Sequence, residues 1–185
     1  MHANHRNTIR RTMTGLILSS LVFSFVAHAD AFSDLQVKRP RVVMQAPDFT
    51  LPDSSGKMQH LSALRGRVII LNFWVTFCAP CRKELPSLQR LAEAYVRRDV
   101  VVLTVAEDPE GLKVVGPYLR QNGITLPALI DKSGSVRKQY GVNAFPMTYL
   151  IGRDGKFIGL IMGARDWYDA SSQKLMDLLL ATNSN

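Results

Sequence analysis

Cysteine is scarce in this chain: two of its 185 residues are cysteine, and both lie in the segment Cys78-Ala79-Pro80-Cys81. A small domain that depends on disulfides as cross-links usually carries four or more cysteines spread along the chain. A bridge between Cys78 and Cys81 closes a very short loop, for which the chain-entropy model gives about 2 kcal/mol. A closed zinc site needs four ligands, usually in two pairs, and the sequence has no second cysteine pair. The two cysteines are therefore poorly suited to a structural role.

A long apolar run is also missing. Crossing a bilayer as a helix takes about 20 apolar residues, whereas the most apolar segment, Gly15–Val26, is shorter than that. A basic leader with three arginines precedes this segment, and Ala27-His28-Ala29 follows it. This arrangement is typical of a secretory signal peptide. We therefore expect residues 1–29 to be cleaved off after Ala29; the alternative is an uncleaved membrane anchor.

Positive charge is present but not concentrated. The chain has 23 Lys and Arg against 15 Asp and Glu, a formal net charge of +8. Residues 1–29 hold three of the basic residues and none of the acidic ones, so the remainder carries +5. A nucleic-acid-binding surface normally shows a denser basic stripe, so we expect no nucleic-acid partner. With no internal repeat, the length predicts one domain over residues 46–185, after an N-terminal extension over residues 30–45.

The two cysteines follow a predicted strand and begin a predicted helix. Val68–Val75 is mostly apolar and β-branched, which is typical of a buried strand. Apolar residues then recur at helical spacing, which predicts a helix over residues 80–97. Cys78 would lie at the N-terminus of that helix, where unpaired N–H groups and the helix dipole favour a thiolate. Cys81, one turn further on, should be less exposed, as a resolving thiol is.

Three interpretations of the pair are open at this point. A redox-active dithiol agrees best with its position at a helix N-terminus. Two thiolates can also hold Cu(I), so a copper-binding protein is an alternative. A purely structural bridge is the third interpretation. It is the weakest of the three, because the loop that the bridge closes is very short.

The segment Asn72–Pro86 (NFWVTFCAPCRKELP) resembles the active-site segment of the thioredoxin superfamily. In detail it resembles the exported TlpA/ResA/CcmG-type thiol–disulfide oxidoreductases. Ala46–Leu51 (APDFTL) is similar to the N-terminal hairpin of that family, which peroxiredoxins share, and Gly141–Ile151 (GVNAFPMTYLI) is similar to its proline segment. The resemblance runs from about Pro47 to Ala181.

The resemblance implies an α/β thioredoxin-like fold, with a central mixed β-sheet covered by helices on both faces and an N-terminal hairpin extension. The alternation of predicted strands and helices, followed by a hairpin and a last helix, indicates the same class. In the family the proline that matches Pro146 is cis, faces the CxxC motif and presents the preceding backbone to the substrate. The resemblance therefore implies a cis Phe145–Pro146 bond. Met147 stands where threonine is frequent in the family.

A proton partner for Cys81 is also expected. Ordinary thioredoxins carry a buried aspartate at the position of Asn72, and an asparagine cannot titrate. The exported subfamily commonly has a glutamate at the exit of the next strand, and here Glu107 ends the strand-like run Val100–Glu107. We therefore predict that Glu107 emerges near the dithiol and relays the proton of Cys81. The alternative is a solvated loop carboxylate.

The function implied is thiol–disulfide exchange by an exported, periplasmic, monomeric enzyme. Cys78 attacks a client disulfide and Cys81 resolves the mixed disulfide, with no cofactor beyond the Cys78–Cys81 disulfide. The resemblance implies a reductase that receives electrons from a membrane thiol-transfer protein. Its implied client proteins are apocytochromes c or copper-site assembly proteins. A Cu(I) carrier and a peroxiredoxin-type thiol peroxidase are the alternatives, although the proline-and-threonine pattern before a peroxidatic cysteine is absent.

Two local expectations complete the sequence analysis. Trp74 and Phe77 flank the predicted turn before Cys78, and we expect both aromatic side chains to lie in the core; the alternative is direct contact with a partner. Gly116-Pro117 interrupts the apolar pattern of Leu112–Leu119, so the helix predicted there should be kinked or restarted.

Overall fold

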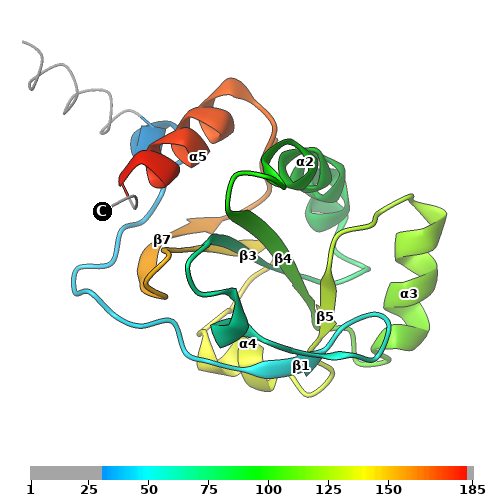
Figure 1. Cartoon of the computed structure of the whole chain (residues 1–185). Coiled ribbons are helices and arrows are strands. Elements are labelled where there is room, and N and C mark those ends of the chain that lie inside the picture. The colour runs from blue at the N-terminus through cyan, green and yellow to red at the C-terminus, as the bar shows by residue number, and fades with distance from the viewer. Residues whose placement is uncertain (1–30, 183–185) are drawn as a thin grey trace, which may run out of the picture.

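The computed structural model describes residues 31–182, so the predicted signal peptide lies outside the described residues. The main sheet has the strand order β5-β4-β3-β6-β7, and a separate two-stranded hairpin, β1-β2, precedes it (Figure 1). Strands β3, β4 and β5 run parallel, whereas β6 and β7 are antiparallel to their neighbours. The sheet is thus mixed, as expected. The strands are β1 Thr50–Pro52, β2 Met58–His60, β3 Val68–Trp74, β4 Val100–Ala106, β5 Ala128–Ile130, β6 Met147–Ile151 and β7 Phe157–Met162.

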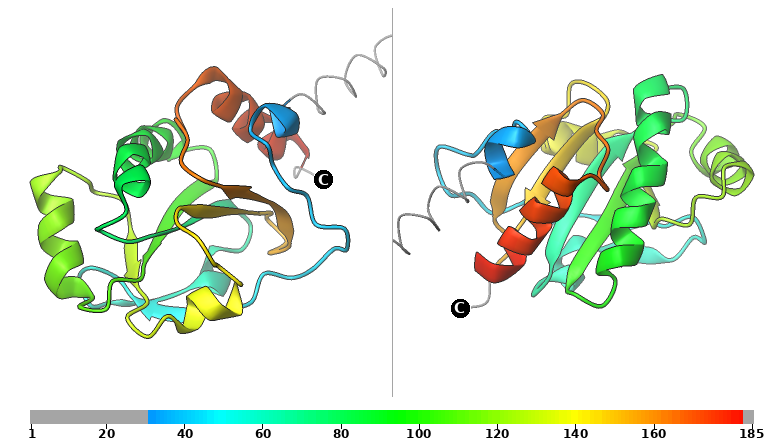
Figure 2. Two further views of the ribbon diagram at one scale, coloured as in Figure 1. Left: turned by 180° about the vertical axis from the view of Figure 1, so that it is seen from behind. Right: turned by 90° about the horizontal axis from the view of Figure 1, so that it is seen from above.

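Helices cover both faces of this sheet. The longest, α2, lies beside α5 on one face, and α4 lies with the hairpin on the other (Figures 1 and 2). The helix α3 runs beside β5 at the sheet edge (Figure 1). The helices are η1 Leu61–Leu64 (a 3-10 turn), α2 Ala79–Tyr95, α3 Leu112–Gln121, α4 Ser135–Gln139 and α5 Ala170–Thr182. In residues 31–182 no helix is long and apolar enough to span a bilayer.

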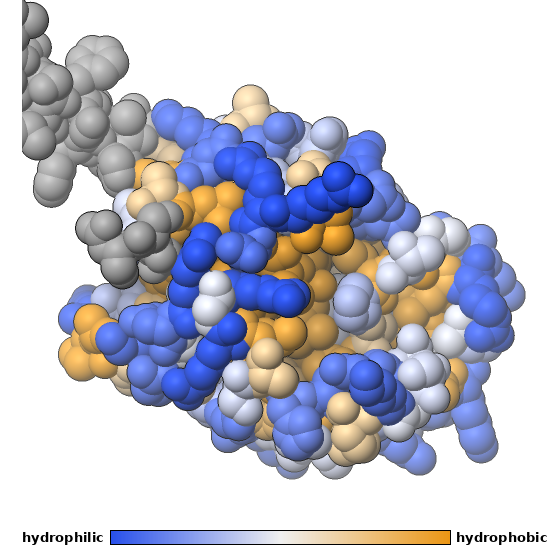
Figure 3. All heavy atoms as spheres, viewed as in Figure 1, coloured by the Kyte–Doolittle hydropathy of each residue, from blue (hydrophilic) through white to orange (hydrophobic). Residues whose placement is uncertain are grey.

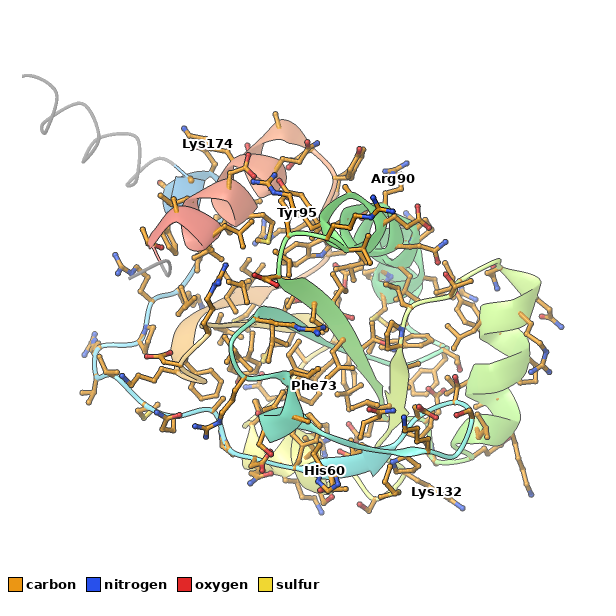
Figure 4. The ribbon with its side chains drawn as sticks, viewed as in Figure 1. His60, Phe73, Arg90, Tyr95, Lys132 and Lys174 are labelled. Atoms are coloured by element: carbon orange, nitrogen blue, oxygen red, sulfur yellow. A yellow bond between two sulfur atoms is a disulfide. The ribbon has the colours of Figure 1, made fainter. Side chains whose placement is uncertain are left out.

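Strand β3 forms the centre of the molecule because all seven of its residues are buried. Successive side chains of a strand point to opposite faces, and the two halves of the core follow this alternation. Ile70 and Trp74 pack on the side of α2 and α5, which we call the α2 face. Leu71 and Phe73 pack on the side of α4 and the hairpin, the α4 face. Figure 4 shows Phe73 between the sheet and the end of the molecule where His60 lies, on the side away from Tyr95.

Both predicted helices are present; the second does not restart at its proline, and the alternative, a kink there, stays a prediction. Helix α2 begins at Ala79, with Pro80 in its first turn where a missing N–H costs little. Pro117 lies inside α3, but the helix is continuous from Leu112 to Gln121 rather than restarted. Its buried residues, Val115 and Leu119 among them, pack into the α2-face core, and this packing outweighs the proline penalty.

The chain that precedes the hairpin runs along the outer edge of β7 (Figure 2). We call residues 37–47 the N-terminal strap. The strap pairs with β7 through Lys38 and Leu160, which exchange two backbone hydrogen bonds of 2.8 and 2.9 Å. It pairs again where Phe157 N donates to Met44 O at 3.0 Å. The strap therefore covers an edge that would otherwise present free backbone groups.

In the view of Figure 3, hydrophilic side chains surround an area of the surface where apolar atoms are exposed.

Candidate active site

The turn before the cysteines is held by a buried carboxylate. Thr76 N donates to both oxygens of Asp108 at 3.1 Å, and Thr76 Oγ1 donates to Asp108 Oδ1. Asp108 is 2 % exposed and follows β4, whose end lies beside the end of β3. These bonds hold the turn against the neighbouring strand. The sequence analysis missed this role because Asp108 is one of several acids in a predicted loop.

Cys78 and Cys81 form a disulfide at the start of α2, with their Cα atoms 5.3 Å apart. Cys78 is the N-cap residue, and its sulfur accepts a hydrogen bond from Cys81 N at 3.2 Å. Cys78 is half-buried, whereas Cys81 is fully buried in the α2-face core. The two sulfurs are therefore unequal in access, as the sequence predicts for an attacking and a resolving thiol. In the reduced form the helix N-terminus would stabilise a thiolate on Cys78.

Glu84 is a buried carboxyl on the same helix. It lies three residues after Cys81, so the two side chains project from the same side of α2, and it is 1 % exposed. Burial raises the pKa of the Glu84 carboxyl to about 7, although the hydrogen bonds that it accepts act in the opposite direction. A carboxyl with this pKa exchanges its proton near neutral pH, as an acid–base group of an active site must.

Three neutral donors surround Glu84. Asn72 Nδ2 donates to Oε1 at 2.7 Å, while Trp167 Nε1 and Arg165 N donate to Oε2 at 3.1 and 3.2 Å. Asn72 Nδ2 also donates to Thr148 Oγ1 at 2.9 Å, which ties β3 to β6 beneath the helix. Asn72 therefore contributes by orienting Glu84 and not by titrating.

Glu84 is not among the site residues that the sequence predicts. Its only signal in the sequence is its position three residues after the second cysteine, which an exposed helical glutamate would share. Its donors Arg165 and Trp167 lie 81 and 83 residues away along the chain and could not be assigned to it.

Glu107 directly follows β4, and its N donates to Trp74 O at 3.1 Å at the end of β3. The odd-numbered residues of β4, such as Val105, lie on the α4 face of the sheet, and Glu107 continues this alternation. Cys81, by contrast, belongs to the core of the α2 face. The carboxylate of Glu107 forms an ion pair with Arg137 on α4, at 2.6 Å between Arg137 Nε and Glu107 Oε2. Arg137 in turn donates to Val142 O at 3.0 Å. The structure thus brings Glu107 to α4 and Glu84 to the helix of the dithiol. The relay role of Glu107 stays a prediction.

Pro146 precedes β6, and the Phe145–Pro146 bond is cis, which confirms the isomer expected from the resemblance. Pro146 is buried, and its carbonyl accepts from Gly163 N at 3.0 Å. The next residue, Met147, pairs with Phe73 near the end of β3 from which the turn to Cys78 departs. Its side chain packs in the α4-face core. The role of Pro146 in presenting substrate stays a prediction.

The two aromatic residues of the turn differ from each other. Trp74 is fully buried and its ring lies 5.6 Å from that of Tyr118. Phe77 is 72 % exposed, so the prediction that it lies in the core is wrong. The turn directs the side chain outward beside Cys78, a direction that composition and spacing do not reveal.

No metal centre is evident in the part of the chain that the structure describes. Within residues 31–182, no three or more His, Cys, Asp and Glu side chains gather as metal ligands.

Comparison with known proteins agrees with this geometry. The model of the AhpC/TSA family matches residues 42–158. The chain belongs to this family. It is 33% identical over 153 residues to the thiol-disulfide oxidoreductase ResA of Bacillus thuringiensis, covering 83% of this chain and 86% of that protein. It is 32% identical over 163 residues to ResA of Geobacillus thermodenitrificans, covering 88% and 91%.

Solved structures of thiol:disulfide interchange and thioredoxin-like proteins show the same fold. A putative thiol:disulfide interchange protein DsbE from Chlorobium tepidum matches with a TM-score of 0.67 and 30% identity, over 73% of this chain and 95% of that one. StoA from Bacillus subtilis matches with a TM-score of 0.60 and 25% identity, over 75% and 98%. With these relatives and its CxxC pair, the chain is a thiol–disulfide oxidoreductase of thioredoxin-like fold.

Proposed function

We propose that this enzyme is an exported protein-disulfide reductase of the periplasm. The observation that carries the proposal is the inequality of its sulfurs: Cys78 is half-buried at a helix N-terminus, and Cys81 is fully buried one turn from Glu84. A reductase needs one sulfur that a client can reach and a second that the client cannot. The disulfide of this pair is the only redox group that the reaction needs.

The proposed reaction starts from the dithiol. The Cys78 thiolate attacks one sulfur of a client disulfide, the other client sulfur leaves as a thiolate, and a mixed disulfide forms. The Cys81 thiol then gives its proton to the Glu84 carboxylate and attacks Cys78 Sγ, which releases the second client sulfur. Two electrons pass to the client, and the Cys78–Cys81 disulfide remains. With its pKa of about 7, Glu84 can accept this proton and release it again near neutral pH.

The proposed electron donor is a membrane thiol-transfer protein, which returns the enzyme, a monomer, to its dithiol form. The proposed clients are exported proteins whose thiols must stay reduced, either apocytochromes c or copper-site assembly proteins. A dedicated reductant is needed in that compartment because thiols are otherwise oxidised there. The similarity to ResA and DsbE proteins supports this assignment.

Trapping tests the proposal. A Cys81→Ala variant cannot resolve the mixed disulfide, so clients should accumulate on Cys78 in the periplasm and be released by dithiothreitol. The Cys78→Ala variant is the matched control and should trap nothing. Clients identified by mass spectrometry should include apocytochromes c or copper-site assembly proteins.

A second measurement shows whether the enzyme reduces or oxidises its clients. The reduction potential of the Cys78–Cys81 pair should lie near the reducing end of the superfamily, roughly −270 mV, rather than near −120 mV. An absence of Cys78-linked adducts, or a potential at the oxidising end, would contradict the proposal. Rapid consumption of peroxide would favour a peroxidase, and stoichiometric Cu(I) binding without reductase activity would favour a copper carrier.

A further inference from the structure

A cavity of about 550 Å³ lies between the N-terminal strap, the end of α4 and the outer strands of the sheet. Its volume lies within the roughly 300–1,000 Å³ that is typical of small-molecule sites. Phe157, in its wall, pairs with Ile151 at the end of β6 opposite to Met147 and Pro146. Neither cysteine nor Glu84 lines it. The cavity is therefore separate from the dithiol site.

The cavity has an aromatic wall whose polar atoms are already bonded. Tyr140, Tyr149 and Phe157 pack against one another with ring centroids 5.1 to 5.7 Å apart. Tyr140 Oη donates to Pro47 O at 2.7 Å, and Tyr149 Oη donates to the carbonyl of Tyr140. These bonds fix the rings and use their hydroxyl groups. The wall thus presents an apolar surface, which would bind the apolar part of a ligand.

The strap forms one wall of the cavity. It is attached to β7 at Lys38 and again at Met44, and between these points it leaves the strand. The cavity lies under this departure, and Leu160 and Gly159 of β7 form part of its lining. A Cβ atom on Gly159 would collide with Val37 Cγ1, so the close approach of strap and strand at this end requires glycine.

The lining carries charge of one sign. Lys38, Arg39 and Lys138 belong to it, and no aspartate or glutamate does. None of the ion pairs formed within residues 31–182 involves these three side chains. Arg39 lies over the ring of Phe32 at 5.0 Å, and Lys38 Nζ contacts Met162 Sδ at 3.4 Å. Three cations without a carboxylate thus border one apolar cavity.

We propose that this cavity binds a single-chain amphiphile with an anionic head group. The apolar chain would lie on the aromatic wall, and the head would be held by Lys38, Arg39 and Lys138. Charge complementarity selects this class, because a cationic ligand would be repelled and an uncharged one would leave the three cations without a counter-ion. A carboxylate, as in a fatty acid, and a phosphate monoester, as in lysophosphatidic acid, share this chemistry.

Calorimetric titration of the purified protein tests the site. The probes are decanoate and decyl phosphate below their micelle concentrations, with decyltrimethylammonium as the cationic counterpart. At least one anion should bind saturably with one molecule per chain, and the cation should not. Affinity should rise roughly fourfold with each methylene from hexanoate to decanoate, as burial of an alkyl chain requires.

Matched variants locate the binding. Reversing the three charges in Lys38→Glu/Arg39→Glu/Lys138→Glu should weaken binding by about tenfold or more. The control is Lys57→Glu/Lys132→Glu/Lys174→Glu, which changes the net charge equally at exposed positions outside the lining; Figure 4 shows Lys132 and Lys174 on separate parts of the surface. This control should bind as the unmodified protein does. A Cys78→Ala/Cys81→Ala variant should also bind normally, because the dithiol is not part of the site.

Each outcome decides the proposal. Binding of decanoate alone identifies a carboxylate ligand, and binding of decyl phosphate alone identifies a phosphate monoester. Equal binding of the cationic probe, unchanged affinity after charge reversal at the cavity, or no saturable binding of either anion would overturn it. None of these results depends on reductase activity, so failure here leaves the proposed function standing.

Discussion

The two faces of the sheet are built from alternate residues of the same strand, and both are mainly apolar, yet they differ in the polar groups that they bury. The α4 face beneath β3 is an aromatic core in which Phe73, Tyr140 and Tyr149 pack ring against ring. The α2 face contains a polar group at its centre, where Asn72 and Glu84 are buried with Cys81. An apolar face maximises stability, whereas a buried carboxyl costs stability and supplies a proton acceptor. The difference indicates that the α4 face supports the fold and the α2 face performs the chemistry.

The largest expected effect concerns the α4 face. Leu71→Ala should lower the free energy of unfolding by about 2–5 kcal/mol, because it leaves a cavity at a fully buried position of the central strand. Urea denaturation of the oxidised protein measures it. The pH profile of thiol exchange in the folded variant should stay that of the unmodified enzyme. A shifted pH profile would contradict the conclusion that the α4 face affects stability but not the chemistry.

The buried carboxyl of the α2 face should make stability depend on pH. The pKa of Glu84 is about 7 in the folded protein, against an ordinary value of 4.5. The folded state therefore holds this proton in a window where the unfolded state has lost it. The free energy of unfolding should fall by about 3 kcal/mol as the pH rises from 4.5 to above 7, and then level off.

Denaturation of the oxidised protein at pH 5 and pH 8.5 measures this dependence. Glu84→Gln should remove this part of it, whereas Glu93→Gln, an exposed change on the same helix, should not. An equal slope in the Glu84→Gln variant would mean that Glu84 does not titrate in this window.

The same substitution should slow the chemistry. Without a proton acceptor near Cys81, Glu84→Gln should reduce the rate of client reduction by about a hundredfold at pH 7, the lower end of general acid–base effects. The rate should also lose its dependence on an ionisation near pH 7. Stopped-flow measurement of insulin or client reduction from pH 5 to 9 gives both quantities. Unchanged rates would remove Glu84 from the mechanism.

A smaller effect is expected at the hydrogen-bond donor to Glu84. Trp167→Phe removes the indole donor from Oε2 and should destabilise the protein by about 1 kcal/mol. It should also raise the pKa of Glu84, because the bond lost favours the ionised form. Trp74→Phe is the control, since Trp74 Nε1 is buried with no hydrogen-bond partner among the described residues. A shift of the pH profile in both variants would point to packing instead of this bond.

The smallest effect is expected at Glu107. Its carboxylate faces Arg137 on the α4 face, so Glu107→Gln should change client reduction much less than Glu84→Gln does across pH 5–8. The pair of variants compares the two candidate carboxyls directly, by the same stopped-flow measurement. A larger effect from Glu107→Gln would restore it as the relay and assign chemistry to the α4 face.

The sequence alone predicted most of the fold and the reacting pair. Three local signals made this possible: the apolar run of β3, the helical spacing after Pro80 and the position of Cys78 between them. Such signals depend only on residues that are neighbours in the sequence, so they can be recognised without a structure. The motifs around Asn72 and Pro146 added the fold class and the cis bond. The outward direction of Phe77 depends on a turn that Asp108 holds through Thr76. These two residues are 32 positions apart, and no sequence pattern predicts their contact.

What only the tertiary structure decided is which carboxyl lies with the dithiol. Glu107 follows a predicted strand and Glu84 follows the second cysteine by three residues, and residue type does not separate them. The alternation of side chains along β4 directs Glu107 to Arg137, and the turn of α2 buries Glu84 among donors from β3 and the segment before α5. Burial and distant partners shift a carboxyl's pKa, and both are properties of the packed molecule. The sequence determined the two sulfurs; packing determined which carboxyl is buried on their helix.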